Sequence, residues 1–176
     1  MVVNVYDVGH GFCGYVRDGI TGANLLIDCG FNEETGFHPS DEALRWGPIG
    51  GLVIQNGDED HLDGLPHLIR TAGPTPMAVL FNNPLNPAAV VYPREDLELL
   101  ARFCQQFDTI AICDEVWEHV VFDGREHIPL ITIPGMRERT IKVGSAGKIF
   151  SLTGWKIGFV CAAPPLLRVA AKVHQF

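Results

Sequence analysis

The stretch RTIKVGSAGKIFSLTGWKIGFVCA, residues 139–162, favours an α/β fold for the second half of the chain. Its two ends, RTIKVGS at residues 139–145 and WKIGFVCA at residues 155–162, are typical of strands, and a turn that carries Lys148 separates them. Further upstream, TIAIC predicts another buried strand that ends at Asp114, and residues 94–107 predict an amphipathic helix. Strands that alternate with helices favour a mainly parallel sheet with flanking helices.

Polar side chains follow the predicted strands at the points where they end. Asn86 lies in the turn after the strand MAVLFN, Asp114 ends the strand TIAIC, and Ser145 ends the strand RTIKVGS. The carboxyl ends of parallel strands meet at one edge of a sheet, where ligands gather. We therefore expect these three residues to lie at a binding edge, with Lys148 close by. The predicted helix should bury the face formed by Leu97, Leu100, Ala101 and Cys104.

The composition limits the class of protein. With 47% hydrophobic and 19% charged residues, the 176-residue chain is globular. A net charge of −8 without a run of basic residues argues against a nucleic-acid partner. No segment approaches the ~18 consecutive apolar residues of a membrane span, and the N-terminus lacks a signal-peptide pattern. Five scattered cysteines without a CxxC pair predict reduced, buried thiols in a cytoplasmic protein.

The texture of the sequence changes at the breaker cluster TAGPTP, residues 71–76. Before it, residues 2–8 and 24–30 predict two short strands with a turn-rich segment between them. We therefore expect a small α+β segment over residues 1–72 and an α/β segment over residues 73–176.

The residues Lys148, Asp114 and Asn86 offer an amine, a carboxylate and an amide. These are the groups that hold pyridoxal phosphate: the amine forms a Schiff base, the carboxylate keeps the pyridine nitrogen protonated, and the amide steadies the ring. Each residue also has a simpler explanation. Lys148 and Lys156 could be solvated surface residues, Asp114 could cap the next segment, and Asn86 could stabilise its own turn.

Four motifs in this half of the chain resemble a known family. They are NNPLNP, DEVWEHVVFDG, PGMRERT and SAGKIFSLTGWKIGF. Together they resemble fold-type I pyridoxal-phosphate-dependent aminotransferases of class I/II, especially the kynurenine and glutamine aminotransferase branch. The resemblance runs from about Pro76 to Phe176 and implies part of an aminotransferase large domain. It implies amino acid and 2-oxo acid substrates and a homodimer.

The resemblance also implies roles for individual residues. Lys148 would be the Schiff-base lysine and proton shuttle, Asp114 would pair with the pyridine nitrogen, and Asn86 would bind the ring hydroxyl. Ser145 and Lys156 fall where the family binds the cofactor phosphate. Trp117 stands where the family has a tyrosine, and an indole cannot give the phenol hydrogen bond. The family's glycine-rich phosphate cup, its stacking aromatic residue and its substrate-binding arginine are not found in the matching stretch.

The first part of the chain resembles a different family. VYDVGHGFCGYV, NLLIDCG and LVIQNGDEDHLDGLPHL are similar to segments of metallo-β-lactamase-fold hydrolases, which carry an HxHxDH motif. Here only Asp60 and His61 match that motif, and Asp58 replaces a histidine. The resemblance implies half of that fold over residues 1–72 and a degenerate site for a divalent metal at Asp58, Asp60 and His61. Such a donor set suits a harder ion than zinc. Alternatively, DEDHLDG is an acidic loop that begins a helix.

Three hypotheses follow for the whole chain. The first is a pyridoxal-phosphate-dependent aminotransferase-like protein with an incomplete site. The second is a metal-dependent hydrolase relic. The third is a non-catalytic chimeric domain, formed by fusion of two truncated families near Thr71.

Overall fold

The computed structural model describes residues 1–9, 11–20, 22, 24–47, 49–54, 59–71 and 78–174, and only the backbone of Glu59 and Asp60. The chain divides into two compact units, Met1–Leu80 and Phe81–Phe176. Each unit has strands and helices of its own.

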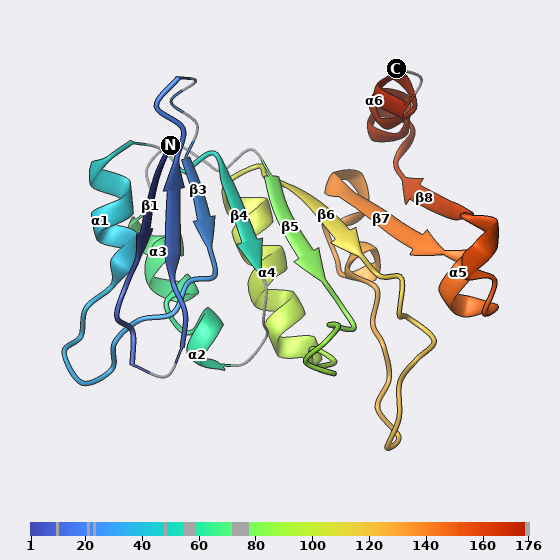
Figure 1. Ribbon diagram of the computed structural model, residues 1–176, viewed down its shortest axis with the longest axis horizontal. Helices are drawn as coiled ribbons and strands as arrows, with labels where there is room; N and C mark the ends of the chain where they lie inside the picture. Colours follow the sequence, from blue (N-terminus) through green and yellow to red (C-terminus); the bar gives the residue numbers. More distant parts are fainter. Residues whose placement is uncertain are drawn as a thin grey trace. The chain divides into compact units, whose positions relative to one another are not determined.

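The first unit contains part of a β-sheet (Figure 1). Its strands, in spatial order, are β1 (Val2–Val5), β2 (Gly14–Arg17), β3 (Asn24–Ile27) and β4 (Gly51–Ile54). The first three strands pair antiparallel, and β3 pairs parallel with β4. Strands β1 and β3 confirm the two strands expected near the N-terminus.

The turn-rich segment between those two strands also contains a strand that the sequence pattern did not indicate. Residues Gly14–Arg17 form β2, in which Tyr15 pairs with Asn4 on one side and with Leu26 on the other. The Tyr15 side chain is only 1% exposed. Because β2 is hydrogen-bonded on both sides and buries an aromatic ring, its tertiary partners override the turn signal of the surrounding glycines.

Three short helices accompany this sheet: α1 (Pro39–Arg45), α2 (Glu59–Leu62) and α3 (Leu65–Thr71). Helix α1 begins with a proline and has acidic residues in its first turn, as the free N–H groups and the helix dipole favour. A hydrogen bond of 2.7 Å between His67 Nε2 and Asp41 Oδ1 links α3 to α1.

An aromatic stack lies beside this hydrogen bond. The ring of His38 stacks on that of His67, with 3.8 Å between the centroids, and on that of Phe31 at 4.6 Å. Burial lowers the pKa of His38, and so do the charges of His67 and Arg70, although Asp41 acts in the opposite direction. Protonation of His38 is therefore disfavoured in the folded chain.

The second unit is built on the strand order β5-β6-β7-β8. The strands are β5 (Ala78–Asn82), which spans the boundary between the units, β6 (Ile110–Asp114), β7 (Thr140–Ser145) and β8 (Gly158–Ala162). Strands β6 and β7 run parallel, and β8 is antiparallel to β7. The expected α/β class, with a mainly parallel sheet and flanking helices, is confirmed.

The expected strand at residues 155–162 begins later than the sequence suggests. Residues Thr153–Trp155 form a 3₁₀ turn, η3, and Lys156 has a left-handed backbone with a φ of 55°. A left-handed residue cannot continue an extended strand, so β8 starts only at Gly158.

The helices of the second unit are α4 (Arg94–Gln106), α5 (Ala146–Ile149) and α6 (Pro164–His174), and two further 3₁₀ turns are η1 (Leu130–Thr132) and η2 (Arg137–Arg139). The expected apolar face of α4 is confirmed. Its buried residues are Leu97, Leu100, Ala101, Phe103 and Cys104. Each fully buried large side chain contributes about 1.5–3 kcal/mol of transfer free energy, so this face stabilises the packing of α4 in the unit.

Between β6 and η1 the chain makes a long excursion that leaves the sheet and returns to it (Figure 1). Residues 115–129 form this excursion and contain no strand or helix.

The cysteines are free, and four of them are buried, as expected, whereas Cys161 is exposed. Burial raises the pKa of both Cys13 and Cys104 to about 12, which keeps these thiols protonated and unreactive at neutral pH. Among the described helices, none has the length and apolar character needed to cross a membrane.

Candidate functional site

The carboxyl ends of three strands meet at one edge of the second unit. The backbone N–H of Asn83, just past β5, and the side-chain amide of Asn82 both donate to the carbonyl oxygen of Asp114, each at 3.1 Å. Asp114 in turn lies opposite Val143 in the parallel pairing of β6 with β7. The ends of β5, β6 and β7 therefore form one continuous edge.

Lys148 lies just beyond this edge, in the short helix α5 that follows β7. Its side chain is exposed, and its Nζ atom lies 4.9 Å from the centroid of the Trp117 ring. At this distance the ammonium group and the indole face attract each other through a cation–π interaction. The structure thus joins two of the residues singled out in the sequence.

A cavity of about 400 Å³ opens beside Lys148. Ser145, Gly147, Lys148, Thr153, Lys156, Ile157 and Gly158 line it. It therefore contains three of the predicted site residues: a hydroxyl from Ser145 and two amines from Lys148 and Lys156. The left-handed backbone of Lys156 and the close approach of Gly147 to Thr153 shape this cavity.

The chemistry of this lining fits pyridoxal phosphate. The volume of the cavity falls within the range of small-molecule pockets. A primary amine can condense with an aldehyde, and a hydroxyl with an ammonium group suits a phosphate. The residues that line the cavity are therefore compatible with a ligand that carries an aldehyde and a phosphate.

The remaining predicted residues, Asn86, Asp114 and Trp117, are not among those that line the cavity. The Asp114 carboxylate accepts a hydrogen bond of 3.3 Å from the N–H of Val116, so it supports the turn after β6. The backbone of the exposed Asn86 donates to Asn82 Oδ1 at 3.2 Å, so it supports its own turn. Both residues thus serve as turn residues at the strand-end edge, and their roles toward a cofactor stay predictions.

The predicted metal residues of the first unit are mostly outside the described part of the chain. Asp58 and the side chain of Asp60 are not described. The Nδ1 atom of His61 lies 2.9 Å from Oδ2 of Asp28, whose side chain is fully buried. His61 therefore has a carboxylate partner that the sequence did not indicate.

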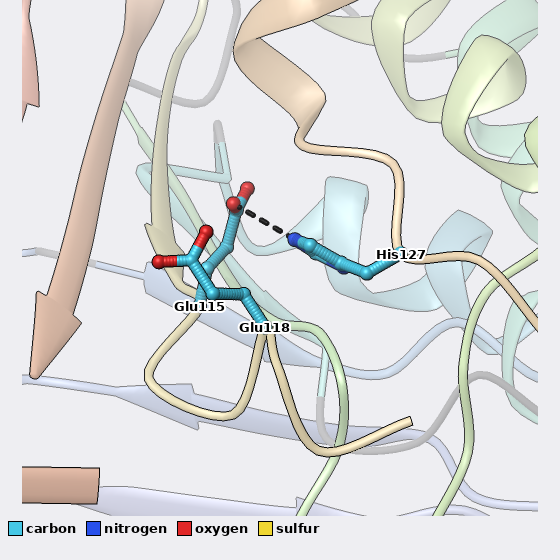
Figure 2. A group of neighbouring side chains, drawn as sticks. All are labelled: Glu115, Glu118 and His127. Atoms are coloured by element: carbon cyan, nitrogen blue, oxygen red, sulfur yellow. Dashed lines mark hydrogen bonds and ion pairs between the residues drawn. The ribbon is translucent and has the colours of Figure 1, made fainter. Parts of the chain in front are cut away.

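A buried ion network follows β6, and the sequence analysis missed it. Glu115, Glu118 and His127 place one ligand atom each within 4.8 Å of one another, and Figure 2 shows the hydrogen bond from the His127 ring to Glu115. That bond measures 3.0 Å, and the N–H of Leu130 donates to the other oxygen of Glu115 at 3.2 Å. These contacts anchor the excursion at its two ends.

The cation in this network is Lys142 of β7. Its Nζ atom lies 3.5 Å from Glu115 Oε2 and makes a close contact with Glu118 Oε2. Burial lowers the pKa of Lys142, but the hydrogen bond to Glu118 and the charges of Glu115 and Glu118 more than offset this, so the net shift is upward. The ammonium group already compensates the carboxylates that a metal ion would need.

The sequence carried one signal of this network. Lys142 interrupts the apolar strand TIKVGS, and a lysine in a buried strand needs a carboxylate partner. Its partners could not be identified, because they lie 24 or more residues away in the chain.

Comparison with known proteins agrees with this geometry. The sequence profile of the family "Aminotransferase class I and II" matches residues 55–176. Human kynurenine–oxoglutarate transaminase 1 is 41% identical over 140 residues, which cover 80% of this chain and 33% of that protein. Human kynurenine–oxoglutarate transaminase 3 is 46% identical over 98 residues, which cover 56% of this chain and 22% of that protein.

Solved structures show the same relationship. A methionine aminotransferase of Escherichia coli superposes with a TM-score of 0.62 at 30% identity, over 76% of this chain and 35% of that one. A putative kynurenine aminotransferase of Saccharomyces cerevisiae gives a TM-score of 0.62 at 32% identity, over 74% of this chain and 33% of that one. The chain thus spans about a third, or less, of the length of these relatives.

The resemblance of residues 1–72 to metallo-β-lactamase-fold hydrolases finds no support in these comparisons, and the matching profile begins inside that segment, at residue 55. The aminotransferase part of the expectation is confirmed by the profile, by the transaminase relatives and by the superposed structures. Because the profile covers more than half of the sequence, the chain belongs to the class I and II aminotransferase family.

Proposed function

We propose that this chain binds pyridoxal 5′-phosphate through Lys148 and takes part in amino transfer between an amino acid and a 2-oxo acid. The observation that carries the proposal is the cavity of about 400 Å³ that Ser145, Lys148 and Lys156 line together. Membership of the family implies pyridoxal phosphate as the cofactor. The cavity offers the amine and the anion-binding groups that this cofactor needs.

Each residue of the cavity has a separate task in this proposal. The Lys148 amine would hold the cofactor covalently and would move the proton at the α-carbon of the substrate. The Ser145 hydroxyl and the Lys156 ammonium group would bind the phosphate. When bound, pyridoxal phosphate supplies an electron sink for the negative charge that develops at that carbon.

Two further residues would act on the ring of the cofactor. Asp114 would keep the ring nitrogen protonated, and Asn86 would donate a hydrogen bond to the ring hydroxyl oxygen. Support comes from the shared strand-end edge, because Asp114 and Ser145 end neighbouring parallel strands. Trp117 contacts the amine of Lys148 through its ring but lacks a phenol group, so it does not provide the hydrogen bond that a tyrosine would give.

The substrates and the assembly are also proposals, since the chain spans a third or less of its relatives. The names of those relatives make kynurenine and 2-oxoglutarate the first substrate pair to assay. A homodimer is supported by exposed apolar side chains on β8 and α6, among them Phe159, Val160 and Val173. Sedimentation velocity should show a dimer, and a strictly monomeric chain at all concentrations would contradict this assembly.

The organisation and location of the chain complete the proposal. We keep the division of the chain into residues 1–72 and 73–176. The boundary between the two compact units, after Leu80, lies close to this division. The buried free thiols support a cytoplasmic location. No observation on the described residues favours the metal-dependent hydrolase.

A titration with pyridoxal phosphate tests the proposal. The purified chain should develop a saturable visible absorption band, because the covalent bond to an amine changes the spectrum of the cofactor. The Lys148→Met variant should lose the band, whereas Lys172→Met, which removes an exposed lysine of α6, should keep it. Saturable binding that is unchanged in Lys148→Met, or no saturable binding by the unmodified chain, would rule out the proposed site.

A further inference from the structure

We propose that Lys142 is a positioning residue that holds Trp117 against the reactive amine of Lys148. It acts through the turn of residues 115–118, which it ties to β7 at both ends. The inference rests on the proposed function only in taking Lys148 as the reactive amine. The contacts that carry it are all within the second unit.

The first step is the attachment of the turn. The N–H of Glu115 donates to the carbonyl oxygen of Val143 at 2.9 Å, which extends the pairing of β6 with β7 by one residue. The chain then turns, and the N–H of Glu118 donates to the carbonyl oxygen of Glu115 at 3.1 Å. Residues 115 and 118 are thus the two ends of one tight turn, and Trp117 lies inside it.

The second step is that one ammonium group contacts the side chains of both ends. Lys142 Nζ lies 3.5 Å from Glu115 Oε2 and makes a close contact with Glu118 Oε2. The side chains of Glu115, Glu118 and Lys142 are 0%, 11% and 13% exposed. Solvent screens charges this deeply buried only weakly. Removing the ammonium group would therefore leave the two carboxylates without their shared cation, and Glu115 would keep only its hydrogen bonds from the His127 ring and the Leu130 N–H. The turn would then have to rearrange.

The third step connects the turn to Lys148. The amine lies 4.9 Å from the centroid of the Trp117 ring, and Lys148 belongs to a helix of only four residues, on which its side chain is exposed. Such a side chain has many accessible rotamers, so the indole face is an important restraint on where the amine lies. The position of Trp117 depends on the turn, and the turn depends on Lys142.

The test measures the reactivity of Lys148 in cofactor-free protein. Brief acetylation with acetic anhydride at fixed pH, followed by mass spectrometry, gives the labelling of Lys148 relative to that of the exposed Lys156 in the same molecule. Trp117→Ala should raise this ratio about 2- to 5-fold, the range that an exposed cation–π contact supports. Lys142→Met should raise it similarly, and the double variant should give no further increase, because both changes remove one restraint.

Two further variants separate positioning from general damage to the fold. Lys142→Arg keeps a cation between the two carboxylates and should restore the ratio toward that of the unmodified chain. Lys172→Met removes an exposed lysine of α6 and should leave the ratio unchanged. Circular dichroism establishes that each variant is folded. If Lys142→Met does not fold, the Glu118→Gln variant is used to test the inference. It weakens the contact between Lys142 and residue 118 while keeping the shape of the side chain.

The outcomes are distinct. An unchanged Lys148 ratio in folded Lys142→Met, or in Glu118→Gln where that variant decides, overturns the inference. So does an unchanged ratio in Trp117→Ala, or full additivity in the double variant. A parallel incubation with pyridoxal phosphate tests the proposed function separately. If the unmodified chain binds no cofactor while the labelling pattern is as expected, the proposed function fails and the positioning role stands.

Discussion

Replacing Glu115 by alanine removes the centre of the buried ion network and should strongly destabilise the second unit. The fully buried carboxylate has three partners: the His127 ring at 3.0 Å, the Leu130 N–H at 3.2 Å and the Lys142 amine at 3.5 Å. Truncating one member of a buried ion pair costs about 3–5 kcal/mol. Because Lys142 keeps its contact with Glu118, we expect the lower end of that range, about 3 kcal/mol.

Urea unfolding followed by circular dichroism measures this loss, and hydrogen exchange of the β6 and β7 amides localises it to the second unit. The matched control is Glu98→Ala on the surface of α4. Glu98 forms an i,i+4 pair of 3.6 Å with Arg94, and both side chains are about half exposed. Its loss should cost no more than about 0.5 kcal/mol. If Glu115→Ala proved no more destabilising than Glu98→Ala, the network would not hold the excursion in place.

Three further predictions concern pH and backbone packing. The pKa of His38 lies below its ordinary 6.5 in the folded chain. As the pH drops below 6.5, the His38 imidazole is protonated in the unfolded chain before it is protonated in the folded chain, so the free energy of unfolding should fall. A His38→Gln variant should show a weaker fall. The pKa of Lys142 lies above its ordinary 10.5 in the folded chain. Its contribution to the free energy of unfolding should therefore be complete below pH 10.5 and disappear as the pH rises through the folded pKa. Urea unfolding of Lys142→Met should no longer show this dependence on pH. In Gly64→Ala, the new methyl group would overlap the carbonyl oxygen of Cys29 and should cost about 1–3 kcal/mol in thermal unfolding, whereas Gly19→Ala, where the methyl group meets nothing within 4 Å, should be nearly neutral.

Strands and helices with a strong periodic pattern could be predicted from the sequence. The predictions that were wrong have local causes. The buried face of α4 follows directly from the spacing of Leu97, Leu100, Ala101 and Cys104. Strand β2 was missed because its four residues begin with Gly14 and are stabilised by strands on both sides rather than by their own pattern. The start of β8 was misplaced because the left-handed backbone of Lys156 has no sequence signal.

The candidate site shows the same division. The position of Ser145 and Asp114 at one sheet edge follows from strand ends, which a sequence reveals. The contact of Trp117 with Lys148 and the ion network around Lys142 join residues far apart in the chain, so no local pattern encodes them. Asn86 was predicted as a site residue, and its described contact is with its own turn.

In the proposed function, Lys148 is the residue that binds pyridoxal phosphate covalently. Borohydride reduction of the chain incubated with the cofactor makes any such bond permanent, and peptide mass spectrometry then identifies the modified lysine. We expect one stoichiometric adduct, on Lys148, that is lost in Lys148→Met. An adduct spread over exposed lysines such as Lys172, or the absence of any adduct on Lys148, would contradict it.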